Sequence, residues 1–131
     1  MQRVAGSLGG ATRLRLGPHA SETAVKSLDL ASYRILSFAT HGLLPGQLRC
    51  DGEPALVLTP PGRPSDADDG LLDASEVAAP WLDADWVVLS ACNTAAGSDS
   101  LSGDSLAGLA GAFIRAGGRR VAWDCPAFVD G

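Results

Sequence analysis

Three apolar runs, each ended by polar or turn-forming residues, dominate the hydrophobic pattern of this chain. They cover residues 33–39, 54–59 and 85–90, and such short runs bounded by turn signals are typical of strands. The first run lacks a strict alternation of polar and apolar residues, which predicts a strand covered on both faces. The shorter segment 12–16 does alternate, and it predicts an edge strand.

Two short helices are predicted from their N-terminal signals, one before the first run and one between the second and third runs. Ser21 is a favourable N-cap residue and opens a segment expected to be helical as far as Ala31. Asp73 is expected to cap a second helix, with Glu76 at the reciprocal position of a capping box.

A longer helix is predicted near the end of the chain. Its apolar residues recur at helical spacing over residues 104–116, and Gly117-Gly118 ends it before a last strand at 119–123. Strands that alternate with helices predict parallel βα units, and therefore an α/β fold with a sheet of mainly parallel strands.

Two residues capable of nucleophilic or acid–base chemistry follow two of the predicted strands directly. His41 comes after the run 33–39, and Cys92 comes after the run 85–90. In parallel sheets, ligands bind beyond the carboxyl ends of the strands. The sequence therefore predicts that His41 and Cys92 lie at the same edge of the sheet as a thiol–imidazole pair.

Such a pair has the chemistry of a cysteine peptidase. The thiolate, not the thiol, attacks a carbonyl, and an imidazole takes the thiol proton near neutral pH and later protonates the leaving amine. The oxyanion that forms needs hydrogen-bond donors, and the backbone N–H groups of Gly42 and Cys92 are the candidates. Because Gly42 has no Cβ, a substrate backbone can approach it closely.

Each residue of the pair also has a plain structural interpretation. A cysteine after an apolar strand is most often a small buried hydrophobic residue, and a histidine before a glycine is often a turn residue. Taken separately, Cys92 and His41 favour these interpretations. Their shared position at the ends of predicted parallel strands favours the catalytic pair.

Metal and cofactor sites are not expected from the remaining residues. Cys50, Cys92 and Cys125 form no Cys-x-x-Cys motif, which favours a reducing compartment and excludes a zinc site of ordinary spacing. We interpret Cys50 and Cys125 as non-catalytic. The acidic segment 65–70 lacks the spacing of an EF-hand and is interpreted as a solvated loop. No phosphate-binding or dinucleotide-binding glycine motif is present.

Length and charge limit the partners of the protein. The chain has 131 residues and a formal net charge of -5, so we expect one domain over residues 1–131 and no nucleic-acid partner. No apolar run approaches the roughly 20 residues of a membrane span. No signal-peptide pattern stands at the N-terminus, and we expect a cytoplasmic protein without a membrane partner.

Four motifs give the chain a resemblance to CHAT domains, the caspase-like peptidase domains often attached to tetratricopeptide repeats. These are FATHG at 38–42, DGLL at 69–72, VVLSAC at 87–92 and LAGLAGAF at 106–113. The resemblance implies a three-layer caspase-hemoglobinase fold of the caspase–separase clan. It also implies His41 as general acid/base, Cys92 as nucleophile, and Gly42 as oxyanion donor beside the Cys92 amide. Peptide or protein substrates and a regulatory domain are the partners it implies.

The chain departs from the CHAT pattern in three places. Asn93-Thr94-Ala95 stands where the family commonly has Glu-Thr-Gly, and Cys125-Pro126 stands where Trp-Pro usually helps form the substrate groove. The family continues beyond the position of Gly131, so we expect a C-terminally truncated domain with an open sheet edge and a tendency to associate.

Three functions remain compatible with the sequence. The first is a cysteine endopeptidase that uses Cys92 and His41. The second is a non-catalytic interaction module in signalling or defence that retains the fold and the pair. The third is a hydrolase or transferase in which Cys92 acts on a non-peptide acyl group. The motifs favour the peptidase.

Overall fold

The computed structural model describes residues 7, 9–43, 53–78, 82–90 and 102–123. Two 3-10 turns, three α-helices and six strands are assigned in this part of the chain. In chain order they are η1 (Gly17–His19), α2 (Glu22–Lys26), η2 (Leu30–Ser32), β1 (Ile35–Ala39), β2 (His41–Leu43), β3 (Ala55–Val57), β4 (Leu71–Asp73), α3 (Ala74–Ala78), β5 (Trp86–Ser90), α4 (Ser102–Arg115) and β6 (Val121–Trp123).

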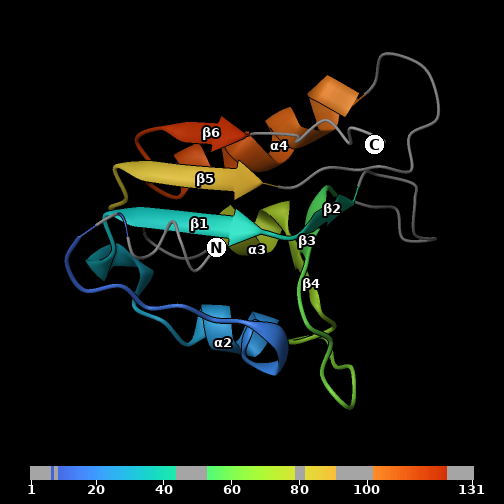
Figure 1. Cartoon of the computed structure of the whole chain (residues 1–131). Helices are drawn as coiled ribbons and strands as arrows, with labels where there is room; N and C mark the ends of the chain where they lie inside the picture. The colour runs from blue at the N-terminus through green and yellow to red at the C-terminus, as the bar shows by residue number, and fades with distance from the viewer. Residues whose placement is uncertain (1–6, 8, 44–52, 79–81, 91–101, 124–131) are drawn as a thin grey trace, which may run out of the picture.

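A parallel sheet of three strands forms the centre of the fold, in the order β1-β5-β6 (Figure 1). β1 pairs with β5 from Ile35 opposite Trp86 to Ala39 opposite Ser90. α4 lies between β5 and β6 in the chain and supplies the crossover that parallel neighbours require. The predicted parallel α/β arrangement is confirmed for these strands.

The other three strands form an antiparallel sheet in the order β2-β3-β4. The sequence predicts a mainly parallel sheet, whereas the described strands divide equally between a parallel and an antiparallel sheet. The run 54–59 belongs to the antiparallel sheet and is a strand only over Ala55–Val57. Its partners β2 and β4 are three residues long, too short for periodicity to reveal their pairing.

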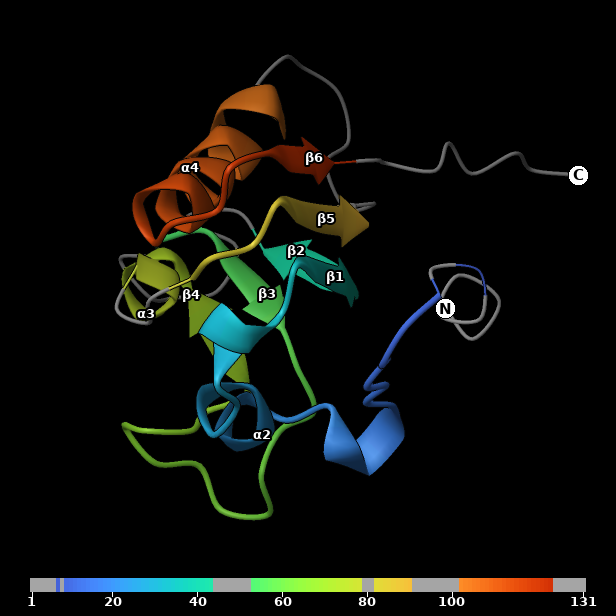
Figure 2. The same cartoon turned by 90° about the vertical axis from the view of Figure 1, so that its left-hand side faces the viewer.

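Helices cover one face of the parallel sheet. α3 and α4 lie on the same side of its strands (Figure 2), and Val87 and Leu89 of β5 are fully buried beneath them with Phe113 of α4. On the opposite face, Ile35 and Trp86 are 39% and 40% exposed. The prediction that β1 is covered on both faces is therefore wrong for the described part of the chain, which shows no third layer of helices.

Local capping signals proved accurate. The Ser21 side chain accepts a hydrogen bond from the Ala24 amide at the start of α2, and Asp73 and Glu76 exchange the two bonds of a capping box at α3. α2 is shorter than predicted because the Ser27 hydroxyl donates to the Ala24 carbonyl and competes with the helical pattern.

The predicted edge strand at 12–16 is irregular backbone in the structure. An isolated alternation of two leucines cannot hold a strand without a hydrogen-bonded partner, and no described strand pairs with this segment.

Gly117 closes the turn between α4 and β6 and permits no side chain. Its φ is +114°, and a Cβ there would lie 2.1 Å from the carbonyl oxygen of Leu82. We expect Gly117→Ala to lower the free energy of unfolding by about 2–4 kcal/mol, because it combines a left-handed backbone with a steric clash. Urea unfolding measures this change. Gly62→Ala is the control, since nothing lies within 4 Å of its Cβ position; equal losses in the two variants would contradict the argument.

Candidate active site

His41 lies where the two sheets meet, separated from the end of β1 by a single residue. The intervening residue, Thr40, bonds to both sheets. Its amide donates to the Ser90 carbonyl over 3.3 Å in the parallel sheet, and its hydroxyl donates to the Val57 carbonyl in the antiparallel sheet. Val57 is the register partner of His41. Thr40 therefore fixes the backbone of His41 against both β5 and β3.

The His41 side chain is exposed, whereas the adjacent Gly42 is buried opposite Leu56. An exposed imidazole at the start of a strand is accessible to a substrate from solvent. No described residue forms a hydrogen bond with this imidazole, so the described part of the chain supplies no side chain that orients it.

Cys92, the predicted nucleophile and second oxyanion donor, lies outside the described residues, as do Cys50 and Cys125. The structure does describe the strand that leads to Cys92. β5 ends at Ser90, which is the register partner of Ala39 in β1. The chain positions of His41 and Cys92 are thus each two residues beyond a paired position at the same edge of the parallel sheet.

A polar cluster around α2, which we call the α2 clamp, supports the loop that leads into the antiparallel sheet. It consists of Glu22, Lys26, Asp68 and Glu76. Glu22 is 1% exposed, and its Oε2 accepts hydrogen bonds from the amides of Asp69 at 3.0 Å and Gly70 at 3.1 Å. These two amides precede β4, so Glu22 sets the entry of the chain into the sheet that carries His41.

Lys26 completes the α2 clamp with two carboxylates. Its Nζ forms ion pairs with Glu22 Oε1 and with Glu76 Oε1, the latter at 2.6 Å, and donates to the Ala67 carbonyl at 3.0 Å. Burial by itself lowers the pKa of Lys26, but the bonds to both carboxylates outweigh burial and raise the pKa. For Glu76, burial outweighs the Lys26 bond and raises the pKa.

Asp68 fixes the same loop to the start of α2. Its Oδ2 accepts bonds from the hydroxyl and the amide of Thr23, and these bonds, the hydroxyl first, lower the pKa of Asp68. Because folding lowers this pKa, the stabilising contribution of Asp68 is present above its unfolded pKa and is lost as the pH falls through the folded value.

The acidic loop 65–70 is thus engaged in bonds with α2 rather than simply solvated. No group of three or more His, Cys, Asp or Glu side chains suited to a metal ion occurs among the described residues. The supporting roles of Glu22 and Thr40 were not predicted from the sequence. The only local signal for the clamp is the i, i+4 spacing of Glu22 and Lys26, which ordinary exposed helices share.

The fold defines an α/β domain in which His41, one residue of the candidate site, follows the carboxyl end of a strand of the parallel sheet. The family model described as CHAT domain matches residues 1–123. The chain belongs to the CHAT domain family. No curated protein and no solved structure matches it. Among the helices of the described residues, none has the length and hydrophobicity needed to cross a membrane.

Proposed function

We propose that this protein is a cysteine endopeptidase domain of the caspase-like CHAT type, with Cys92 as nucleophile and His41 as general acid/base. The register of β1 and β5, which places Ala39 beside Ser90, is the observation that carries the proposal. Two residues reach at most about 7 Å along the chain, so His41 and Cys92 are tethered to neighbouring points of one sheet edge.

The proposed reaction is acyl transfer through a thioester. His41 takes the thiol proton of Cys92, and the thiolate attacks the carbonyl carbon of the peptide bond. The backbone N–H groups of Gly42 and Cys92 donate to the oxyanion. The imidazolium of His41 then gives its proton to the leaving amine, and the C–N bond breaks. Water, deprotonated by His41, hydrolyses the thioester and regenerates the thiol.

Peptides or proteins are the proposed substrates, and tetratricopeptide repeats or another regulatory domain are the proposed partners. The exposure of His41 supports an extended substrate that crosses the sheet edge, because a buried imidazole reaches only small molecules. Membership of the CHAT domain family supports the same class of reaction.

Differential alkylation tests the proposal directly. We expect iodoacetamide at neutral pH to modify Cys92 at least about tenfold faster than Cys50 or Cys125, because an adjacent imidazole raises the thiolate fraction. Mass spectrometry of the three cysteine peptides over time measures the rates, and the unfolded protein provides the reference in which all three react alike.

Two results would contradict the peptidase. One is equal alkylation of the three cysteines in the folded protein. The other is a Cys92→Ala variant that cleaves a mixed peptide library as well as the parent chain. Partner binding that survives Cys92→Ala without any cleavage would instead identify the non-catalytic interaction module.

A further inference from the structure

β1 is the edge strand of the parallel sheet, and its far side has no strand partner among the described residues. The bonds to β5 come from even-numbered positions: the Trp86 amide donates to the Arg34 carbonyl, and the Thr40 amide donates to the Ser90 carbonyl. Because successive residues of a strand direct their backbone groups to opposite sides, the odd-numbered positions face away from β5.

The N–H and C=O groups of Ile35, Ser37 and Ala39 therefore face the open edge. No described residue forms a hydrogen bond with these groups on that side. A row of unpaired backbone donors and acceptors is a ready template for another strand.

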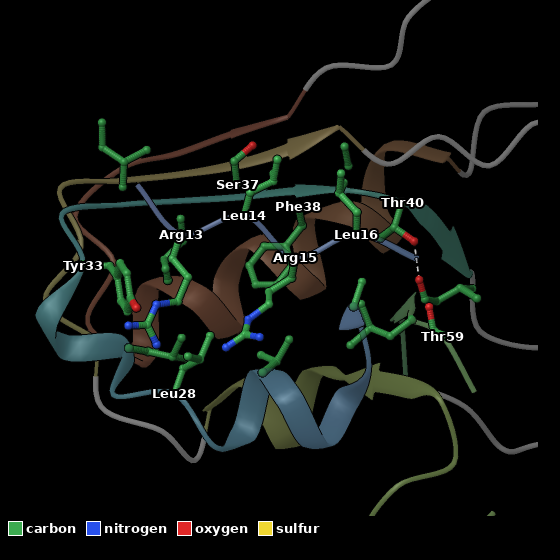
Figure 3. Close-up of a pocket in the computed structure, with 18 of the residues that line it drawn as sticks. Arg13, Leu14, Arg15, Leu16, Leu28, Tyr33, Ser37, Phe38, Thr40 and Thr59 are labelled. Carbon is green, nitrogen blue, oxygen red and sulfur yellow. Dashed lines mark hydrogen bonds between the residues drawn. The ribbon is translucent and has the colours of Figure 1, made fainter. Parts of the chain in front are cut away.

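A cavity of about 540 Å³ lies along this edge (Figure 3). Residues 35–40 line one side of it, and the irregular segment 13–16 and α2 line others. Most of the lining is apolar, with Leu28 and Phe38 among the residues that face the space. The volume lies within the range of pockets that hold small ligands or short peptide segments.

The charged residues of the cavity lining are both cationic. Arg13 and Arg15 line the cavity, and no aspartate or glutamate does, although the chain carries a net charge of -5. Both arginines are exposed, and no described carboxylate forms an ion pair with either. Figure 3 shows their side chains directed to the same side, away from Leu14 and Leu16.

We propose that the open edge of β1 binds an extended acidic peptide segment as an added strand, with carboxylates two residues apart facing Arg13 and Arg15. Side chains on one face of an extended peptide repeat every two residues, at about 6.6 Å, which is also the sequence spacing of the two arginines. Main-chain bonds to β1 supply affinity, and the arginines select acidic side chains.

Two other occupants fit the observations less well. A small anion satisfies the arginines but leaves the edge carbonyls of β1 without donors. A second copy of β1 supplies donors, but its sequence ILSFA carries no carboxylate for the arginines. The peptide satisfies both requirements. This binding site does not rest on the Cys92–His41 chemistry, and its test measures binding alone.

The experiment uses fluorescence anisotropy with the full chain and a fluorescein-labelled, capped peptide of sequence Val-Glu-Val-Glu-Val. We expect saturable binding that weakens with added salt. The matched peptide Val-Lys-Val-Lys-Val is expected not to bind. A Val-Glu-Val-Glu-Val peptide N-methylated at the positions that pair with the edge is also expected not to bind, because it keeps the charges and loses the donors.

Protein variants separate the two parts of the site. Arg13→Gln and Arg15→Gln are each expected to weaken binding about fivefold, as for an exposed charge pair, whereas Arg63→Gln, which removes the same charge outside the cavity, leaves it unchanged. Ser37→Pro is expected to abolish binding, because proline removes an edge donor without breaking a bond to β5. Ser37→Ala is its control.

Amide exchange gives an independent readout. The peptide is expected to protect the amides of Ile35, Ser37 and Ala39, the donors that face the open edge. Peptide binding that survives Ser37→Pro or N-methylation would overturn strand addition. Binding of the fatty-acid anion dodecanoate by a chain that does not bind the peptide would also overturn it. A dimer that Ser37→Pro dissociates, in a chain that does not bind the peptide, would also overturn it in favour of a second copy.

Discussion

Glu22→Ala is expected to lower the free energy of unfolding by about 3 kcal/mol, a large part of the stability of a small domain. The loss comes mainly from the amides of Asp69 and Gly70, which donate to Glu22 Oε2 and have no alternative acceptor in the described structure. An unsatisfied buried donor costs about 1–3 kcal/mol. The ion pair with Lys26 adds little, because the Lys26 side chain is 35% exposed and keeps Glu76 as a partner.

The position of Glu22 gives this prediction a local signature. The two amides lead into β4, which pairs with β3, and β3 pairs in turn with β2. We therefore expect amide exchange in β2, β3 and β4 to accelerate more than exchange in β5 or β6, which belong to the parallel sheet. Local opening of this kind precedes global unfolding in many domains.

Urea unfolding monitored by tryptophan fluorescence measures the stability change, and Asp66→Ala serves as the control. Asp66 lies in the same acidic loop but is exposed, so its removal is expected to change the free energy of unfolding by less than about 0.5 kcal/mol. Glu22→Gln keeps one acceptor oxygen, and its free energy of unfolding is expected to lie between those of Glu22→Ala and Asp66→Ala. Equal stability of Glu22→Ala and Asp66→Ala would show that the clamp does not hold the loop.

The elements that sequence analysis predicted well depend on short-range interactions. The Ser21 cap joins residues three positions apart, as do the two bonds between Asp73 and Glu76, so spacing alone reveals them. β1 and β5 were visible as apolar runs, and the strand–helix order was enough to predict their parallel pairing.

The features that were missed depend on contacts between distant parts of the chain. Glu22 reaches amides 47 and 48 residues away, and nothing in its neighbourhood distinguishes it from an exposed glutamate. β2 forms its antiparallel pair with β3. The length of the chain that connects the two strands does not reveal which residues pair. The prediction that both faces of β1 are covered is wrong because Ile35 is apolar but exposed. Hydropathy alone does not distinguish such a residue from one in the core.

The strands that lead to the candidate site were predictable from the sequence, and their parallel pairing is confirmed. The placement of Cys92 beside His41 stays a prediction, because Cys92 lies outside the described residues. The role of Thr40 was not predictable, because a threonine before a histidine carries no sign that its hydroxyl crosses to a second sheet. That bond nevertheless helps to fix the position of the His41 backbone.

His41→Ala is expected to lower kcat/KM for peptide cleavage by about 10³-fold, within the range for loss of a general acid/base. The exposed side chain of His41 contributes little to the core, so the free energy of unfolding is expected to change by less than about 0.5 kcal/mol. His19→Ala removes the other histidine of the chain from an exposed 3-10 turn, and its cleavage activity is expected to match the parent.

Two further variants show whether His41 acts with Cys92 as a unit and whether Thr40 positions it. The double variant His41→Ala with Cys92→Ala is expected to be no less active than Cys92→Ala alone, because the effects of residues that act together are strongly non-additive. Additive losses in the double variant would show that His41 does not take part in the chemistry of Cys92.

Thr40→Val removes the bond to the Val57 carbonyl and is expected to lower kcat about tenfold with KM unchanged, since it shifts the imidazole without removing it. A Thr40→Val effect confined to KM would assign Thr40 to substrate binding, so the split between kcat and KM decides how the two sheets position the proposed base.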